Sequence, residues 1–328
     1  MDSVIDQPAT ANSAATVAPA AVASVSLAGF EADRDGFAQR LGASFERYGF
    51  AIVADHGIPA DLIAQAEAAA KALFALPEPT KLDYRPARGG GQRGYTAFGT
   101  EAAKDATAVD LKEFWHVGRE LPAGHRYADA MAPNIWPEEL TAFRATMLDL
   151  YAAFEATGAR LLEAIARYLG LAPDFFVDTV ADGNSVLRLL HYPPVTHDGP
   201  SIRAGAHEDI NTITLLLGAE EAGLEILDRD GQWLAVTPGE GALAVNVGDM
   251  LQRLTNGRLR STTHRVANPA SARRGVARYS MPFFLHFRPD YLIETLPSCI
   301  DAAHPDRTPA PITAHDYLMQ RLREIKLL

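Results

Sequence analysis

The spacing of hydrophobic residues divides the chain into a helical first half and a strand-rich second half. Apolar residues recur three and four positions apart in the early part, which is typical of helices with one buried face. Gly49 and Gly170 each follow such a segment and are suited to end a helix, whereas Gly158 lies inside one, where we expect a bend or a break. The pattern predicts helices over residues 37–48, 60–74 and 137–169.

Short apolar segments separated by turn residues fill the second half of the chain. Asp230-Gly231, between two such segments, is a hairpin signal. Short strands with no helix between them favour an antiparallel sandwich or barrel. A last segment at helical spacing, residues 314–325, predicts a C-terminal helix. The predicted strands cover residues 22–27, 50–53, 186–192, 211–217, 224–227, 233–236, 242–247, 250–254, 264–267 and 278–287.

Two segments lack a regular pattern. Residues 1–23 are rich in Ala, Ser, Thr and Pro and contain no aromatic residue, so they predict a disordered tail. Residues 77–110 contain several prolines and a run of glycines, which fits either an active-site lid or a flexible connection. We therefore expect one folded unit over residues 24–328. Its parts are a helix-rich segment (24–180), a strand-rich core (181–290) and a C-terminal segment with a helix (291–328).

Composition and charge narrow the class of partner. The chain has 328 residues, with 30 Lys and Arg against 41 Asp and Glu, and a formal net charge of −11. This acidic balance argues against a general binder of nucleic acid or of anionic membranes. No apolar run reaches the ~20 residues that a membrane-spanning helix needs, so no membrane partner is expected. The single cysteine, Cys299, excludes a disulfide framework or a Cys-rich metal site and fits a cytoplasmic setting.

His207-Glu208-Asp209 is the strongest candidate for metal binding in the sequence. In an extended chain, alternate residues face the same side, so His207 and Asp209 can converge on one ion while Glu208 faces away. His264 begins a later predicted strand and is the candidate for a third ligand. Two histidines and one carboxylate on one side of a metal leave the opposite positions open, which is typical of non-haem Fe(II) oxygenases. The helical His-Glu-x-x-His motif of zinc hydrolases is absent from the chain.

A candidate site for a carboxylate follows these residues. Arg278 and Ser280 share one face of a predicted strand, and a guanidinium with an adjacent hydroxyl can hold a carboxylate. Arg188 and Tyr192 share a face of an earlier strand, where Tyr192 can donate a hydrogen bond to the same group. The ordinary alternatives are an ion pair for Arg278 and core packing for Tyr192.

The candidate site residues belong to a longer series of short motifs that are spread along the chain. They are Tyr48-Gly49-Phe50, Asp55-His56-Gly57-Ile58-Pro59, Arg93-Gly94-Tyr95, Gly205-Ala206-His207-Glu208-Asp209, Val245-Asn246-Val247-Gly248-Asp249, His264-Arg265-Val266 and Arg278-Tyr279-Ser280. With these motifs the chain resembles the non-haem iron, 2-oxoglutarate-dependent oxygenases of the isopenicillin N synthase-like family. The resemblance covers most of residues 24–328.

This resemblance implies a fold, a set of cofactors and a reaction. The implied fold is α+β and mainly β, a distorted double-stranded β-helix (jelly roll) with flanking helices and its core in residues 181–290. The implied enzyme uses Fe(II), 2-oxoglutarate and O2 to hydroxylate or desaturate a small organic molecule. It releases succinate and CO2 and has no catalytic residue beyond the metal centre. The implied ligands are His207, Asp209 and His264 for iron, and Arg278, Ser280, Tyr192 and Arg188 for 2-oxoglutarate.

The substrate pocket is less well marked in the sequence. Leu190 stands where the commoner plant-type pattern often has Asn, which removes a polar contact near the iron. Several large apolar residues near the motifs are candidates for the pocket, although core packing is the ordinary role of each. These candidates are Tyr95, Phe98, Phe114, Trp115, Phe283 and Leu285.

Three alternatives remain open from the sequence. An oxidase of the isopenicillin N synthase type keeps the iron but does without 2-oxoglutarate, because the Arg278–Ser280 pair then holds a carboxylate of the substrate itself. An ethylene-forming variant is a further outcome on the same site. A non-catalytic jelly-roll protein that binds or senses a ligand is the alternative of a different class.

Overall fold

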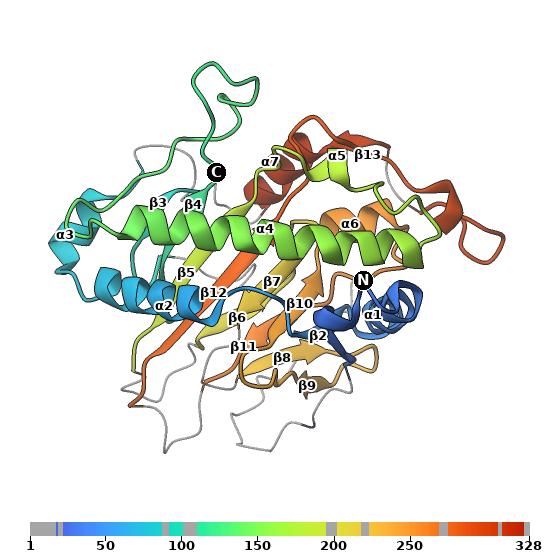
Figure 1. Cartoon of the computed structure of the whole chain (residues 1–328), viewed down its shortest axis with the longest axis horizontal. Helices are drawn as coiled ribbons and strands as arrows, with labels where there is room; N and C mark the ends of the chain where they lie inside the picture. Colours follow the sequence, from blue (N-terminus) through green and yellow to red (C-terminus); the bar gives the residue numbers. More distant parts are fainter. Residues whose placement is uncertain are drawn as a thin grey trace, which may run out of the picture.

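The computed structural model describes residue 18 and residues 22–86, 92–100, 110–194, 202–217, 223–268, 275–307 and 310–324. Most of the predicted tail (1–23) lies outside these ranges. The same holds for residues 87–91 and 101–109 of the predicted lid or connection. The described chain forms two facing β-sheets, with a layer of helices packed on the larger one (Figure 1).

The larger sheet has eight strands and the smaller one has four. All strand pairs in these two sheets are antiparallel except β1 (Ser24–Ser26) with β2 (Phe50–Ala54). In spatial order the larger sheet contains β1 (Ser24–Ser26), β2 (Phe50–Ala54), β10 (Leu243–Val247), β7 (Ile213–Leu217), β12 (Arg278–Leu285), β5 (Val186–Tyr192), β4 (Glu113–Gly118) and β3 (Gly94–Thr96). The smaller sheet contains β6 (Ala204–His207), β11 (His264–Val266), β8 (Leu224–Leu227) and β9 (Trp233–Ala235). A separate pair consists of β13 (Leu292–Ile293) and β14 (Ile312–Thr313).

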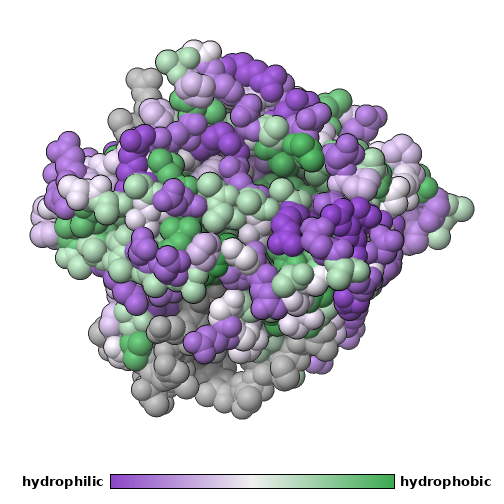
Figure 2. Space-filling view, in the orientation of Figure 1, coloured by the Kyte–Doolittle hydropathy of each residue, from purple (hydrophilic) through white to green (hydrophobic). Residues whose placement is uncertain are grey.

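Helices α1 (Arg34–Tyr48), α2 (Ala60–Phe74) and α4 (Phe143–Tyr168) pack on the outer face of the larger sheet. There α4 lies across the strands beside α1 and α2, and its outward surface mixes hydrophilic and hydrophobic residues (Figures 1 and 2). The main hydrophobic core fills the space between this layer and the sheet. The helices are α1 (Arg34–Tyr48), α2 (Ala60–Phe74), α3 (Glu78–Asp83), α4 (Phe143–Tyr168), α5 (Val177–Val180), α6 (Asp249–Leu254) and α7 (Ala314–Glu324).

Alternation along the strands gives the larger sheet two different faces. On β12, Phe283 turns toward the helices, where its ring stacks on Phe154 with 5.2 Å between centroids. The neighbouring residue Phe284 turns to the opposite face, which is the interior of the sandwich and lines a cavity there. The functional site therefore lies between the sheets, and α1, α2 and α4 stabilise the larger sheet from its other face.

The architecture confirms the predicted class of an antiparallel β core with flanking helices, with corrections to individual elements. Residues 250–254 were predicted as a strand, but they belong to helix α6, because their apolar residues lie on one helical face. Strand β4 was not predicted, since polar and apolar residues along it are buried alike and no alternation marks it. Helix α3 and strand β3 lie in the segment predicted to be irregular, and α4 begins at Phe143 rather than at Pro137.

Gly158 permits the close approach of α4 to β12 and does not divide the helix, which continues from Phe143 to Tyr168. A Cβ atom at Gly158 would come within 2.4 Å of Leu285 Cδ1. The prediction of a break at this glycine was therefore wrong.

We expect Gly158→Leu to lower the free energy of unfolding by about 1–3 kcal/mol, the usual cost of overpacking a core. The better helix propensity of leucine offsets at most ~1 kcal/mol of this cost. Urea unfolding measures the change. If Leu285 is the obstacle, the double variant Gly158→Leu/Leu285→Ala loses less stability than the two single variants added together. Additive losses would contradict this explanation.

Candidate metal centre

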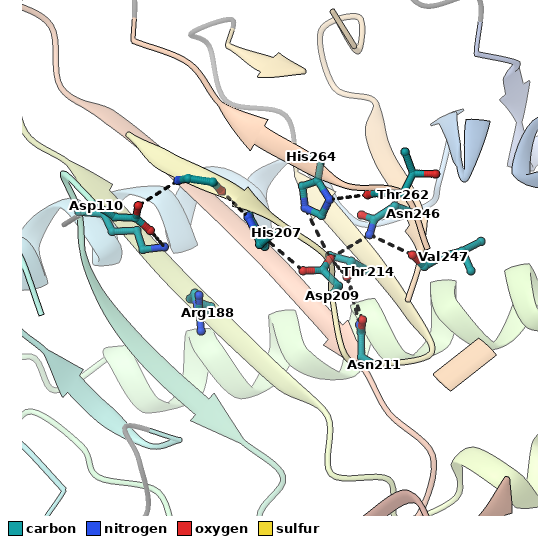
Figure 3. Close-up of polar contacts among 12 residues, drawn as sticks. Asp110, Arg188, His207, Asp209, Asn211, Thr214, Asn246, Val247, Thr262 and His264 are labelled. Atoms are coloured by element: carbon teal, nitrogen blue, oxygen red, sulfur yellow. Dashed lines mark hydrogen bonds and ion pairs between the residues drawn. The ribbon is translucent and has the colours of Figure 1, made fainter. Parts of the chain in front are cut away.

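Three side chains from the smaller sheet and the loop after β6 converge at one point inside the sandwich (Figure 3). His207 ends β6 and His264 begins β11, and the two residues are paired directly across these strands. Asp209 follows two residues after His207. Each residue offers one ligand atom, and the three atoms lie within 4.8 Å of one another. Among the described residues, these three are the one group of His, Cys, Asp or Glu side chains close enough together to share a metal ion, and they are the group predicted from the sequence.

Both imidazoles are oriented by the backbone. His207 Nδ1 donates to the carbonyl oxygen of Gly205 at 2.8 Å, and His264 Nδ1 donates to that of Thr262 at 3.0 Å. Protonation at Nδ1 leaves each Nε2 with a free lone pair, as a metal ligand requires. Each Nε2 points toward Asp209, at 3.8 Å from Oδ1 for His207 and 3.9 Å from Oδ2 for His264.

The carboxylate of Asp209 is held on its other side by two hydrogen bonds. Oδ2 accepts from Thr214 Oγ1 at 2.5 Å and from Asn246 Nδ2 at 2.8 Å (Figure 3). Burial raises the pKa of this carboxyl, but the two histidines and the two hydrogen bonds outweigh burial, so the pKa is lowered overall. Asp209 is therefore ionised at neutral pH. Two imidazoles and one carboxylate fit a divalent transition metal that keeps open positions.

The structure brings the predicted carboxylate-binding residues together. Arg278 begins β12 and is paired with Tyr192 of β5, and its guanidinium lies 5.0 Å from the centre of the Tyr192 ring. Arg278 Nη1 donates to Ser280 Oγ at 3.1 Å. All three side chains are buried. A buried guanidinium with a hydroxyl beside it is suited to hold a carboxylate.

A cavity of about 510 Å3 is lined by the metal-binding residues His207 and Asp209 and by Arg188. The Arg188 guanidinium lies 4.3 Å from the ring centre of Phe114 and 5.2 Å from that of Phe284. Its Nε donates to His116 Nε2 at 2.6 Å. Arg188 is thus one of the basic side chains that a ligand in this cavity would meet.

None of the six candidate pocket residues is among the described side chains that line this cavity. Four of them belong to the core between the larger sheet and the helices, namely Tyr95, Trp115, Phe283 and Leu285. Phe98 is 48% exposed, and Phe114 packs in a small buried cluster between the sheets. The aromatic lining comes instead from Phe284, with His286 one position further along the same face. The alternation that paired Arg278 with Ser280 also points to these two residues, which share their parity.

The family of the chain follows from comparison with known proteins. Residues 183–287, which include every residue of the metal centre, match the family described as the 2OG-Fe(II) oxygenase superfamily. Residues 22–139 match a second family, described as the N-terminal region of a non-haem dioxygenase in morphine synthesis. The chain belongs to the 2OG-Fe(II) oxygenases. The resemblance noted from its motifs is thereby confirmed.

Individual relatives are similar to this oxygenase in sequence or structure over most of its length. It is 36% identical over 289 residues to the 2-oxoglutarate-Fe(II) type oxidoreductase hxnY of Emericella nidulans, covering 85% of this chain and 81% of the relative. A solved 2OG-Fe(II) oxygenase family protein from Caulobacter crescentus is 57% identical, with a TM-score of 0.88 over 93% of this chain and 99% of the other. A full-length protein from Neurospora crassa, solved in complex with alpha-KG and thymine, is 30% identical, with a TM-score of 0.83 over 92% of this chain and 96% of the other.

This oxygenase is therefore a 2-oxoglutarate-dependent dioxygenase with a jelly-roll core, whose cofactors are Fe(II) and 2-oxoglutarate. The alternative of a non-catalytic sensing protein is not supported by these relatives. Within the described part of the chain, no helix has the length and apolar character needed to cross a membrane.

Proposed function

We propose that this oxygenase hydroxylates or desaturates a small organic molecule and releases succinate and CO2. The observation that carries the proposal is the position of His207 and Asp209 in a cavity of about 510 Å3, with His264 completing the metal site. Cavities of about 300–1,000 Å3 are typical of small-molecule sites. The Neurospora crassa relative of similar fold binds thymine together with alpha-KG, which supports a substrate of this size.

In this proposal, each part of the site has one task. His207, Asp209 and His264 hold Fe(II), while Arg278, Ser280 and Tyr192 hold the distal carboxylate of 2-oxoglutarate. When bound, iron and 2-oxoglutarate together supply the activation of O2. The protein fixes the open side of the metal site toward the cavity and keeps the carboxylate-binding residues away from bulk water.

Arg188 is assigned a place between these groups. It lines the cavity on β5, on the same strand face as Tyr192, and it is stacked on two aromatic rings. We assign it to the part of the cavity between 2-oxoglutarate and the organic substrate, where its guanidinium can orient either one.

A screen of small organic molecules, read by succinate release, tests the proposed reaction. The expected result is a substrate that gives succinate and oxidised product in equal amounts, and only in the presence of Fe(II), 2-oxoglutarate and O2. Product formation with O2 but without succinate would instead support an oxidase of the isopenicillin N synthase type. Ethylene release from 2-oxoglutarate alone would support the ethylene-forming variant.

A further inference from the structure

We propose that Lys112 is a second cation for 2-oxoglutarate and that its ammonium contacts the distal carboxylate beside Arg278 and Tyr192. This inference rests on the proposed function, because it adds a residue to the same cosubstrate site. Lys112 lies directly before β4, the strand that the sequence pattern did not predict.

The register of the sheet places Lys112 at the end of the row that holds the predicted carboxylate-binding residues. On β4 and β5, Glu113 is paired with His191, so the preceding residue Lys112 comes opposite Tyr192. Tyr192 is paired in turn with Arg278 on the other side. Because alternate residues of a strand face the same side, Lys112 faces the interior of the sandwich, as Phe114 and His116 do.

A buried ion pair holds Lys112 in the cavity of the metal site. Its Nζ lies 2.8 Å from Asp110 Oδ2, and both side chains are only 7% exposed. Asp110 Oδ1 accepts a hydrogen bond at 2.9 Å from the backbone N–H of Gly205 on β6, the strand that ends in His207 (Figure 3). Lys112 and Asp110 both line the cavity that contains His207. Lys112 therefore lies in the cavity of the metal centre, one strand beyond Tyr192 and two strands beyond Arg278 in the larger sheet.

The charge and geometry of this group suit a dicarboxylate. An ammonium carries three N–H donors, so the Lys112 side chain can hold Asp110 and a ligand oxygen at the same time. A carboxylate taken out of water into this interior needs compensating positive charge, and a cation that is already buried has lost its own hydration before the ligand arrives. The buried ammonium of Lys112 therefore gains more interaction free energy from an anionic ligand than an exposed lysine would.

Anaerobic titration of the Fe(II)-loaded enzyme with 2-oxoglutarate, followed by the metal-to-ligand charge-transfer absorption, tests the inference without any organic substrate. The variant Asp110→Asn/Lys112→Met removes both charges, while the Asn oxygen can still accept from Gly205. We expect it to bind 2-oxoglutarate about 10- to 100-fold more weakly, the usual worth of a hydrogen bond to a charged group. Asp110→Asn alone keeps the cation and is expected to bind at least as tightly as the native enzyme.

Two controls complete the experiment. Lys71→Met removes an exposed lysine on α2, on the other side of the larger sheet near the Tyr279 ring, and is expected to leave binding unchanged. The ligand 2-oxopentanoate lacks the distal carboxylate, so the native enzyme and the double variant are expected to bind it equally.

The proposal is overturned if the double variant binds 2-oxoglutarate like the native enzyme, since Lys112 would then only stabilise the fold. It is also overturned if the variant loses affinity for 2-oxopentanoate to the same extent. A native enzyme that gives no charge-transfer absorption with Fe(II) and 2-oxoglutarate would contradict the proposed function itself, before Lys112 comes into question.

Discussion

Asp209→Ala is expected to abolish both iron binding and turnover. Losing a residue that only supports a metal ligand typically costs about 10–100-fold in metal affinity or activity, and loss of the sole anionic ligand should cost more. The two remaining ligands are neutral imidazoles, and Thr214 and Asn246 would be left pointing at an empty position. Anaerobic titration with Fe(II) and 2-oxoglutarate measures the loss as a missing charge-transfer absorption, and succinate release measures turnover.

Glu208→Ala provides the matched control, because it removes a carboxylate from the adjacent position. The side chain of Glu208 is exposed, lies outside the cluster of three ligands and accepts a hydrogen bond from Thr263 Oγ1 at 2.9 Å. We expect this variant to keep iron binding. The assignment of the ligands would be wrong if Asp209→Ala kept the absorption, or if Glu208→Ala lost it.

The metal ligands could be predicted because the necessary information is local. His207 and Asp209 are two residues apart, and alternation in an extended chain brings them to the same side whatever the rest of the fold does. The third ligand needed a long-range pairing. His264 begins a predicted strand, which makes it the candidate third ligand, and the structure pairs it with His207 in register. Helix α2 was also predicted at its observed bounds, since Pro59 and the apolar spacing mark it.

The substrate pocket was harder to predict because a buried residue of the larger sheet can lie either in the core under the helices or in the cavity between the sheets. Phe283 and Phe284 are adjacent aromatic residues, yet one packs against Phe154 and the other lines the cavity. Hydrophobicity alone cannot separate these two faces. The position of the neighbouring strand β4 decides which polar side chains enter the cavity, and Lys112 and His116 were missed as site residues because that strand was not recognised.

Arg278→Ala is expected to raise the apparent KM for 2-oxoglutarate by roughly 30-fold to more than 1,000-fold. Truncating one partner of a buried, hydrogen-bonded charge pair costs about 2–5 kcal/mol, and each ~1.4 kcal/mol is a factor of ten. Arg278 is buried at the start of β12, hydrogen-bonded to Ser280 and stacked near Tyr192, so no water can easily take the place of its guanidinium. Steady-state kinetics with each substrate varied in turn measure the effect.

The same variant separates the two uses of the Arg278–Ser280 pair. If Arg278 holds 2-oxoglutarate, the KM for 2-oxoglutarate rises while the KM for the organic substrate changes little, and binding of 2-oxopentanoate is unaffected. If the pair holds the organic substrate, as in an oxidase of the isopenicillin N synthase type, the KM of that substrate rises instead. Ser280→Ala should move the same constant in the same direction by a smaller factor, because it removes one neutral hydroxyl and keeps the charge. An unchanged requirement for 2-oxoglutarate in Arg278→Ala would remove Arg278 from this role.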